Sequence, residues 1–98
     1  MKDLSVALLL EVYGDLLTKR QQRIARDYFD DDFSLSEISE NEGISRQGAH
    51  EIIKRTEQLL LFYEEKLHYY KTVCDLKEAA EHNDTSAIYE IIKKLYWR

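Results

Sequence analysis

Four polar residues, Ser45, Arg46, Gln47 and His50, lie within six positions, and their side chains are of the types that hydrogen-bond to nucleic acids. A guanidinium group matches two acceptors on the edge of guanine, and a side-chain amide matches the edge of adenine. His50 is a candidate phosphate donor, with a structural or exposed histidine as the alternative. For Arg46 and Gln47 the alternative is two solvated residues on the first turn of a helix. The chemistry predicted here is noncovalent recognition.

Two more cations, Lys54 and Arg55, follow on the same expected helix. Lysine and arginine in such places contact backbone phosphates, which position a protein without reading sequence. Ion pairs with Glu51 or Glu57 along the helix are the alternative.

A second basic group consists of Lys19, Arg20, Arg23 and Arg26, whose helical spacings form a stripe. The chain carries a net charge of −5, which argues against unspecialised nucleic-acid binding because cations supply most of that affinity. The acids concentrate at Asp30–Asp32 and at Glu37, Glu40 and Glu42. The stripe therefore predicts either phosphate contacts or a solvated face that pairs with these acids.

The segment from Ser34 to Ile53 must position the first group of residues, and it reads as two short helices joined at one glycine. Ser34 with Glu37 predicts a capping box at the first helix. Gly43 fits the left-handed conformation in which that helix would end. Ser45 then caps the second helix, and Ala49 and Ile52 face the core. This is the outline of a DNA-binding helix-turn-helix.

The remaining sequence predicts an all-α fold, because its 98 residues contain no proline and three glycines. We expect a single domain over residues 1–98, with a helix-turn-helix core at 18–58 and a helical extension at 59–98. Apolar spacing predicts a first helix over residues 3–14, ended by Gly14. Thr18 and Gln21 predict a capping box for the next helix, which would end at or before Asp30–Asp32.

The helix that begins after Ser45 has no breaker, so it should run well past the length that reading DNA requires. Further helical stretches are expected around Val73–Ala80 and after Asn83 and Asp84. Two arrangements stay open between Tyr63 and His82, namely a continuous helix and a break near His68. The aromatic end at 96–98 is either a lid on the core or a contact for another chain.

The run L-L-L-F-Y within the long helix is apolar on every side and must be covered. We expect it to form a homodimer interface, with the C-terminal helices folding back over it as the alternative. The interface residues would be Leu59, Leu60, Leu61, Phe62 and Tyr63.

Other classes of function find little support in these residues. The three histidines share no ligand spacing with Cys74, and no glycine-rich loop is present to hold a phosphate, so we expect no enzyme, metal or cofactor. A membrane span and a signal peptide are not expected either. The single cysteine fits a reducing cytoplasm.

Several motifs resemble known families. Between Leu17 and Leu60, the segments L-T-K-R-Q-Q-R, Y-F, S-L-S-E-I-S-E and G-I-S-R resemble region four of bacterial sigma factors, which reads a promoter element. With I-S-R-Q-G-A-H, E-I-I-K-R-T-E and Y-E-E-K-L, almost the whole chain resembles the YlxM-like family of small helix-turn-helix proteins, encoded beside the genes of the signal recognition particle GTPase.

This resemblance implies a regulatory, non-enzymatic protein of the signal recognition particle pathway. The sigma pattern places Arg46, Gln47, His50 and Glu51 near phosphates or base edges. Three positions depart from it: Gly48 replaces a long DNA-reading side chain, Ala49 a larger aliphatic one, and Glu42 takes a position that usually packs inward.

Two hypotheses follow for the partner. In one, a dimer presents two recognition helices to DNA. In the other, the chain is an adaptor that does not bind DNA and contacts the particle's GTPase or its RNA through aromatic and arginine side chains.

Overall fold

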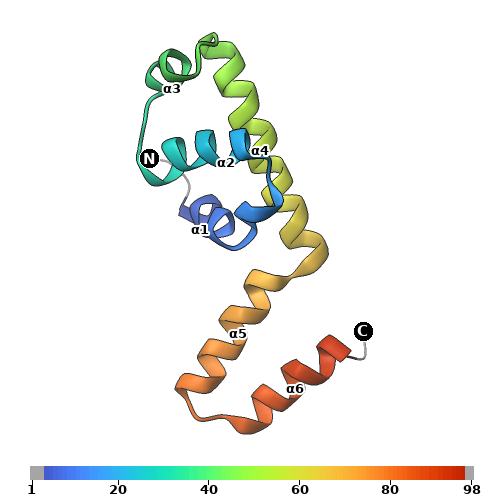
Figure 1. Ribbon diagram of the computed structural model, residues 1–98. Coiled ribbons are helices and arrows are strands. Elements are labelled where there is room, and N and C mark those ends of the chain that lie inside the picture. Colours follow the sequence, from blue (N-terminus) through green and yellow to red (C-terminus); the bar gives the residue numbers. More distant parts are fainter. Residues whose placement is uncertain (1–3, 97–98) are drawn as a thin grey trace. The chain divides into compact units, whose positions relative to one another are not determined.

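The computed structural model describes residues 4–96, and every regular element in that range is helical. The α-helices are α1 (Leu4–Tyr13), α2 (Lys19–Ala25), α3 (Leu35–Glu42), α4 (Arg46–Leu67), α5 (Tyr69–Glu81) and α6 (Thr85–Tyr96) (Figure 1). A 3₁₀ turn, η1 (Gly14–Leu16), follows α1, and a π-helical segment, η2 (Arg26–Asp30), follows α2. The predicted all-α fold is confirmed.

The chain divides into two compact units, residues 1–66 and 67–98, which are described separately below. The expectation of a single domain over 1–98 stays a prediction. The predicted roles of Trp97 and Arg98 lie outside the described residues, as does the side chain of Tyr96. None of the described helices combines the length and the apolar character needed to cross a bilayer.

Capping boxes begin α2 and α3 at the predicted residues. Thr18 Oγ1 accepts from the Gln21 amide at 3.1 Å, and the Gln21 side chain accepts from the Thr18 amide at 3.0 Å. Ser34 and Glu37 repeat the arrangement, with both hydrogen bonds at 3.1 Å. Each pair satisfies two backbone donors that have no partner within the helix, which fixes where the helix begins.

The end of α2 differs from the expected regular helix, because the backbone widens into η2. The Asp31 amide donates to the Arg26 carbonyl at 3.0 Å, five residues back. Segments of this kind insert one extra residue into a helical turn. The widened turn places Tyr28 and Phe29 against the helix-turn-helix core, with their rings edge to face at 5.0 Å. Asp31 and Asp32 lie beyond the end of η2, as predicted.

The turn between α3 and α4 is centred on Gly43, which adopts the predicted left-handed conformation with φ 67°. The next amide, that of Ile44, donates to the Ser39 carbonyl at 3.0 Å and closes the turn. Ser45 Oγ then accepts from the Gly48 amide at 3.0 Å, which confirms Ser45 as the cap of α4.

The long helix α4 ends at Leu67, and of the two arrangements left open the structure has the break at His68. His68 is left-handed with φ 51°, and α5 begins at the next residue. Asn83, with φ 53°, separates α5 from α6, and Asp84 Oδ1 caps α6 by accepting from the Ala87 amide at 3.0 Å.

The core of residues 4–66 joins α1 to the helix-turn-helix. Ile24, Ile38, Ala49 and Ile53 form a buried cluster between α2, α3 and α4. In α1, Val6, Leu9, Leu10 and Tyr13 are buried. The Tyr13 hydroxyl donates to Glu64 Oε1 at 2.5 Å, so α1 is tied to the far end of α4.

We expect Gly43→Ala to lower the free energy of unfolding by about 1 kcal/mol, because a side chain disfavours this positive φ. A Cβ atom at this position would have no neighbour within 4 Å, so backbone strain alone is measured. Gly43→Asn should cost less, since asparagine tolerates the left-handed region better. Urea unfolding of the three proteins tests this, and equal stability of the alanine variant and the parent would contradict it.

Candidate nucleic-acid interface

The first turn of α4 is exposed, because the buried side of this helix begins at Ala49. Ala49 is 0% exposed and Ile53 is 5% exposed, and both pack against Ile24 and Ile38. This contact fixes the rotation of α4 about its axis. The predicted contact residues Ser45, Arg46, Gln47, His50, Lys54 and Arg55 are all exposed.

An acidic residue shares this surface. Gln47 Nε2 lies 3.4 Å from Glu51 Oε1, at the long end of hydrogen-bond distances. Glu51 carries a negative charge on the outer side of α4, so a phosphate would approach more readily at Arg46 or Lys54 than next to it.

A hollow of about 380 Å³ lies between the start of α2 and the side of α4. It brings Arg20 of the stripe beside Arg55 of the long helix, two cations that the sequence had placed in separate groups. The residues that line it are Thr18, Arg20, Gln21, Gly48, Glu51, Ile52 and Arg55.

Because Gly48 has no side chain, the hollow extends to the backbone of α4 at this position. A Cβ atom there would meet Ser45 Oγ at 3.3 Å and otherwise only Ile44, at 3.9 Å or more. Gly48 follows its capping serine by three residues, as Glu37 follows Ser34 and Gln21 follows Thr18. Since the other two helices carry a side chain at this position, the fold itself does not require a glycine.

The basic stripe is partly neutralised within the chain. Arg23 donates from Nε and Nη2 to both carboxylate oxygens of Glu42, at 2.8 and 2.7 Å, and Arg20 Nε lies 3.6 Å from the same group. The Glu42 side chain is only 10% exposed. Arg23 pairs with Glu42 and joins α2 to α3, with its side chain 54% exposed, and its phosphate contact stays a prediction. Lys19 and Arg26 are exposed and stay predicted contacts.

The ion pair favours the ionised form of Glu42. Its pKa is lowered mainly by the hydrogen bond from Arg23, with the charges of Arg23 and Arg20 adding to the effect and burial opposing it. The pKa of Arg23 is raised for the same reason. Nearby, burial and then the charges of Asp31 and Glu42 raise the pKa of Asp27. The sequence offered pairing of the stripe with these acids as an alternative, but it did not identify which residues pair, because Arg23 and Glu42 are nineteen residues apart.

The apolar run in α4 is only partly accessible. Leu60 is 0% exposed, so this residue is wrong as a dimer contact: the chain's own core covers it. Leu61 and Phe62 are each 50% exposed, while Leu59 and Tyr63 are partly buried. Of the five predicted interface residues, these two present the most open surface.

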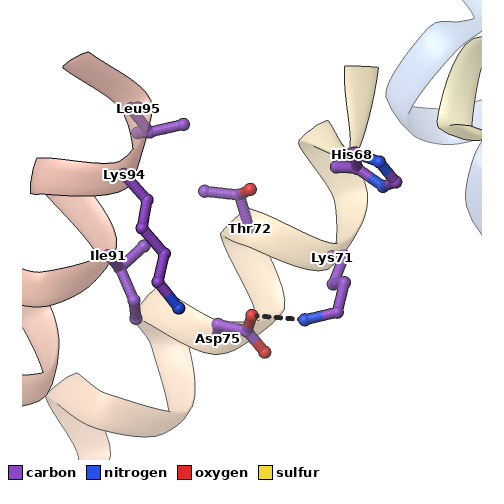
Figure 2. Close-up of a pocket in the computed structure, with 7 residues that line it drawn as sticks. All are labelled: His68, Lys71, Thr72, Asp75, Ile91, Lys94 and Leu95. Carbon is purple, nitrogen blue, oxygen red and sulfur yellow. Dashed lines mark hydrogen bonds and ion pairs between the residues drawn. The ribbon is translucent and has the colours of Figure 1, made fainter. Parts of the chain in front are cut away.

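A second hollow, of about 540 Å³, lies between α5 and α6 (Figure 2). Its polar edge includes Lys71, whose Nζ lies 3.0 Å from Asp75 Oδ2. The residues that line it are His68, Lys71, Thr72, Asp75, Ile91, Lys94 and Leu95. No sequence prediction had placed a site here. Nowhere in the described part of the chain do three His, Cys, Asp or Glu side chains gather closely enough to hold a metal ion.

Comparison with known proteins identifies a family that matches almost the whole chain. Residues 1–95 match the family described as "Putative helix-turn-helix protein, YlxM / p13 like". A UPF0122 protein of Symbiobacterium thermophilum is 42% identical over 95 residues, which are 89% of each chain. A UPF0122 protein of Fusobacterium nucleatum is 44% identical over 80 residues, 74% of this chain and 78% of the relative. One of Clostridium kluyveri is 36% identical over 91 residues, 93% of this chain and 78% of the relative.

We expect Glu42→Gln to lower the melting temperature by a few degrees at pH 7, because it removes the charge that holds Arg23 and Arg20. A lowered pKa in the folded state means that the carboxylate stabilises the fold above its ordinary pKa of 4.5 and ceases to do so as the pH falls through the lower, folded value. The difference from the parent should therefore shrink as melting is measured at progressively lower pH.

The matched control for this experiment is Glu40→Gln, which removes the same charge from an exposed position on α3. Asp27 is present in both variants and in the parent, and burial, the main cause of its raised pKa, is common to all three; Glu42→Gln also removes one smaller contribution, the charge of Glu42. Equal melting of the two variants at pH 7, or a difference that persists in strong acid, would contradict the assignment.

Proposed function

The chain belongs to the YlxM / p13-like family of helix-turn-helix proteins, and from this premise we propose that it is a regulatory protein that binds DNA through the first turn of α4. The observation that carries the proposal is the exposure of Arg46 and Gln47 at the start of a helix whose opposite side is fixed in the core by Ala49 and Ile53. A helix held in this way presents its first side chains to the major groove.

The proposed contacts divide by role. Arg46 and Gln47 reach base edges, whereas Lys54 and Arg55, with Lys19 and Arg26 on α2 and η2, meet the phosphates. Ser45 and His50 are further candidates for phosphate contacts. The two cations beside the hollow, Arg20 and Arg55, would hold the backbone that passes over Gly48.

We further propose that the protein acts in the cytoplasm as a homodimer, so that two copies of α4 contact sites about 34 Å apart, one turn of DNA. Leu61 and Phe62, each half exposed, support an apolar contact between copies. Participation in the signal recognition particle pathway is part of the proposal and rests on the YlxM-like resemblance.

The second candidate is an adaptor that does not bind DNA and contacts the particle's GTPase or its RNA. The observation that favours it is the pairing of Arg23 and Arg20 with Glu42 in a chain of net charge −5, because these cations are then less available to DNA phosphates. Half-exposed Leu61 and Phe62 would serve as apolar anchors for a protein partner.

Band shifts with genomic fragments at near-physiological salt test the first candidate. Arg46→Ala should weaken binding of a preferred fragment by about tenfold or more, the usual cost of one bidentate base contact. Lys77→Ala removes one positive charge from exposed α5 and should leave binding nearly unchanged. If no fragment is bound better than bulk DNA, and the particle's GTPase or RNA is enriched in a pull-down, the adaptor replaces the DNA-binding proposal.

Substitution of Gly48 separates stability from binding. Gly48→Ala should raise the free energy of unfolding by up to about 1 kcal/mol, because alanine is the better helix former. Gly48→Gln should also stabilise, by completing a third capping box with Ser45. Both should weaken DNA binding, because their side chains occupy the hollow. Variants that are more stable and bind as tightly as the parent would contradict the close approach of DNA at this glycine.

A further inference from the structure

Glu42 contacts Arg23 in the way that a phosphate would. Arg23 donates to both carboxylate oxygens, from Nε at 2.8 Å and from Nη2 at 2.7 Å. This edge of a guanidinium group presents two N–H donors in a fixed geometry, which matches the oxygens of a carboxylate or of a phosphate. The edge that Arg23 would offer to a nucleic-acid backbone is therefore occupied by a carboxylate of the same chain.

Arg20 is held more weakly by the same carboxylate. Its Nε lies 3.6 Å from Glu42 Oε1, which is longer than an ordinary hydrogen bond, so the attraction is mainly between opposite charges. Arg20 also lines the hollow between α2 and α4, as does Arg55. One guanidinium group is thus shared between an internal carboxylate and the surface proposed for DNA phosphates.

The cations and the carboxylate of this cluster differ in access to solvent. The side chains of Arg20 and Arg23 are 50% and 54% exposed, whereas that of Glu42 is 10% exposed. An external phosphate can therefore reach the guanidinium groups while the carboxylate stays covered. The two anions would compete for the same N–H donors.

Turning the arginines away from Glu42 has an energetic cost. A covered carboxylate that loses its hydrogen-bonded cation keeps a charge that nothing compensates. A nucleic acid that binds through Arg20 and Arg23 has to offset this cost, which lowers its affinity. The lowered pKa of Glu42 agrees with this view, since its largest cause is the hydrogen bond from Arg23.

The chain has few other cations on this side to take their place. Lys19 and Arg26 complete the basic stripe, so the contacts with Glu42 involve two of its four cations. Neutralisation of phosphates supplies essentially all of the affinity for nucleic acid that does not depend on sequence. In a chain of net charge −5, occupying two cations should weaken such binding strongly.

We propose that Glu42 competes with nucleic-acid phosphates for Arg20 and Arg23, and that this autoinhibitory contact lowers the affinity of the chain for bulk DNA. The inference rests on the proposed DNA binding, whose regulation it describes. A parent that binds a preferred fragment through Arg46, with no gain when Glu42 is replaced, contradicts only this inference. A chain that gains affinity on loss of Glu42, but binds equally well after Arg46→Ala, contradicts only the proposed function.

Band shifts with a random-sequence DNA duplex at low salt, well below the melting temperature of each variant, test the competition. Glu42→Gln should bind about tenfold more tightly than the parent, because the arginines become free to meet phosphates. Glu40→Gln removes the same charge from an exposed position on α3 and should gain clearly less. Misfolding would lower the affinity and cannot imitate this gain. No binding by Glu42→Gln, or a gain no larger than that of Glu40→Gln, would overturn the inference.

The salt dependence of binding identifies the cations that are released. Each neutralised phosphate adds about 0.9 to the negative slope of log K against log salt, so the slope of Glu42→Gln should be steeper than that of the parent by about one or two. Adding Arg20→Ala and Arg23→Ala to Glu42→Gln should return the slope and the affinity to those of the parent or below. A gain that survives both arginine substitutions would show that net charge alone raises the affinity, and would overturn the inference.

Discussion

The packing of Ala49 and Ile53 against Ile24 and Ile38 is the contact on which the arrangement of residues 4–66 depends. It fixes the rotation of α4, and the rotation determines which side chains meet solvent. The caps add the second constraint, because a helix that begins at a fixed residue begins with known side chains. Together they hold the first turn of α4 outward.

For the candidate nucleic-acid interface, the distribution of charge matters more than the net charge of the chain. The Glu42 side chain is only 10% exposed between α2 and α3, and its contacts with Arg23 and Arg20 make its burial tolerable. The same contact withdraws cations from the stripe that faces solvent. The candidate interface thus depends on the cations of α4, together with Lys19, Arg26 and Arg20, the last of which borders the hollow beside Arg55. A binding surface with so few cations favours a partner that is also recognised by shape or by specific hydrogen bonds.

Local signals were enough to predict the helix starts and the turn, because a cap or a left-handed glycine involves residues within four positions of one another. Ser34, Gly43 and Ser45 all behave as expected. Contacts between distant residues were predicted less well. Leu60 continues the spacing of Ala49, Ile53 and Thr56, so the periodicity of α4 places it toward the core, whereas the apolar run around it suggested a dimer contact. No residue near Glu42 identifies Arg23 as its partner. The π-helical η2 was missed as well, since its residues also suit an ordinary helix. The DNA-binding role stays a proposal, because exposure of a side chain does not identify its partner.

The proposed contact of the first turn of α4 with nucleic acid is measured most directly by amide chemical shifts. The probe is a DNA duplex selected by this chain from a random pool at near-physiological salt. Titration should shift the amides of residues 45–51 and leave those of the hairpin, 69–95, nearly in place. Shifts confined to the hairpin, or failure of the selection to enrich any duplex, would contradict it.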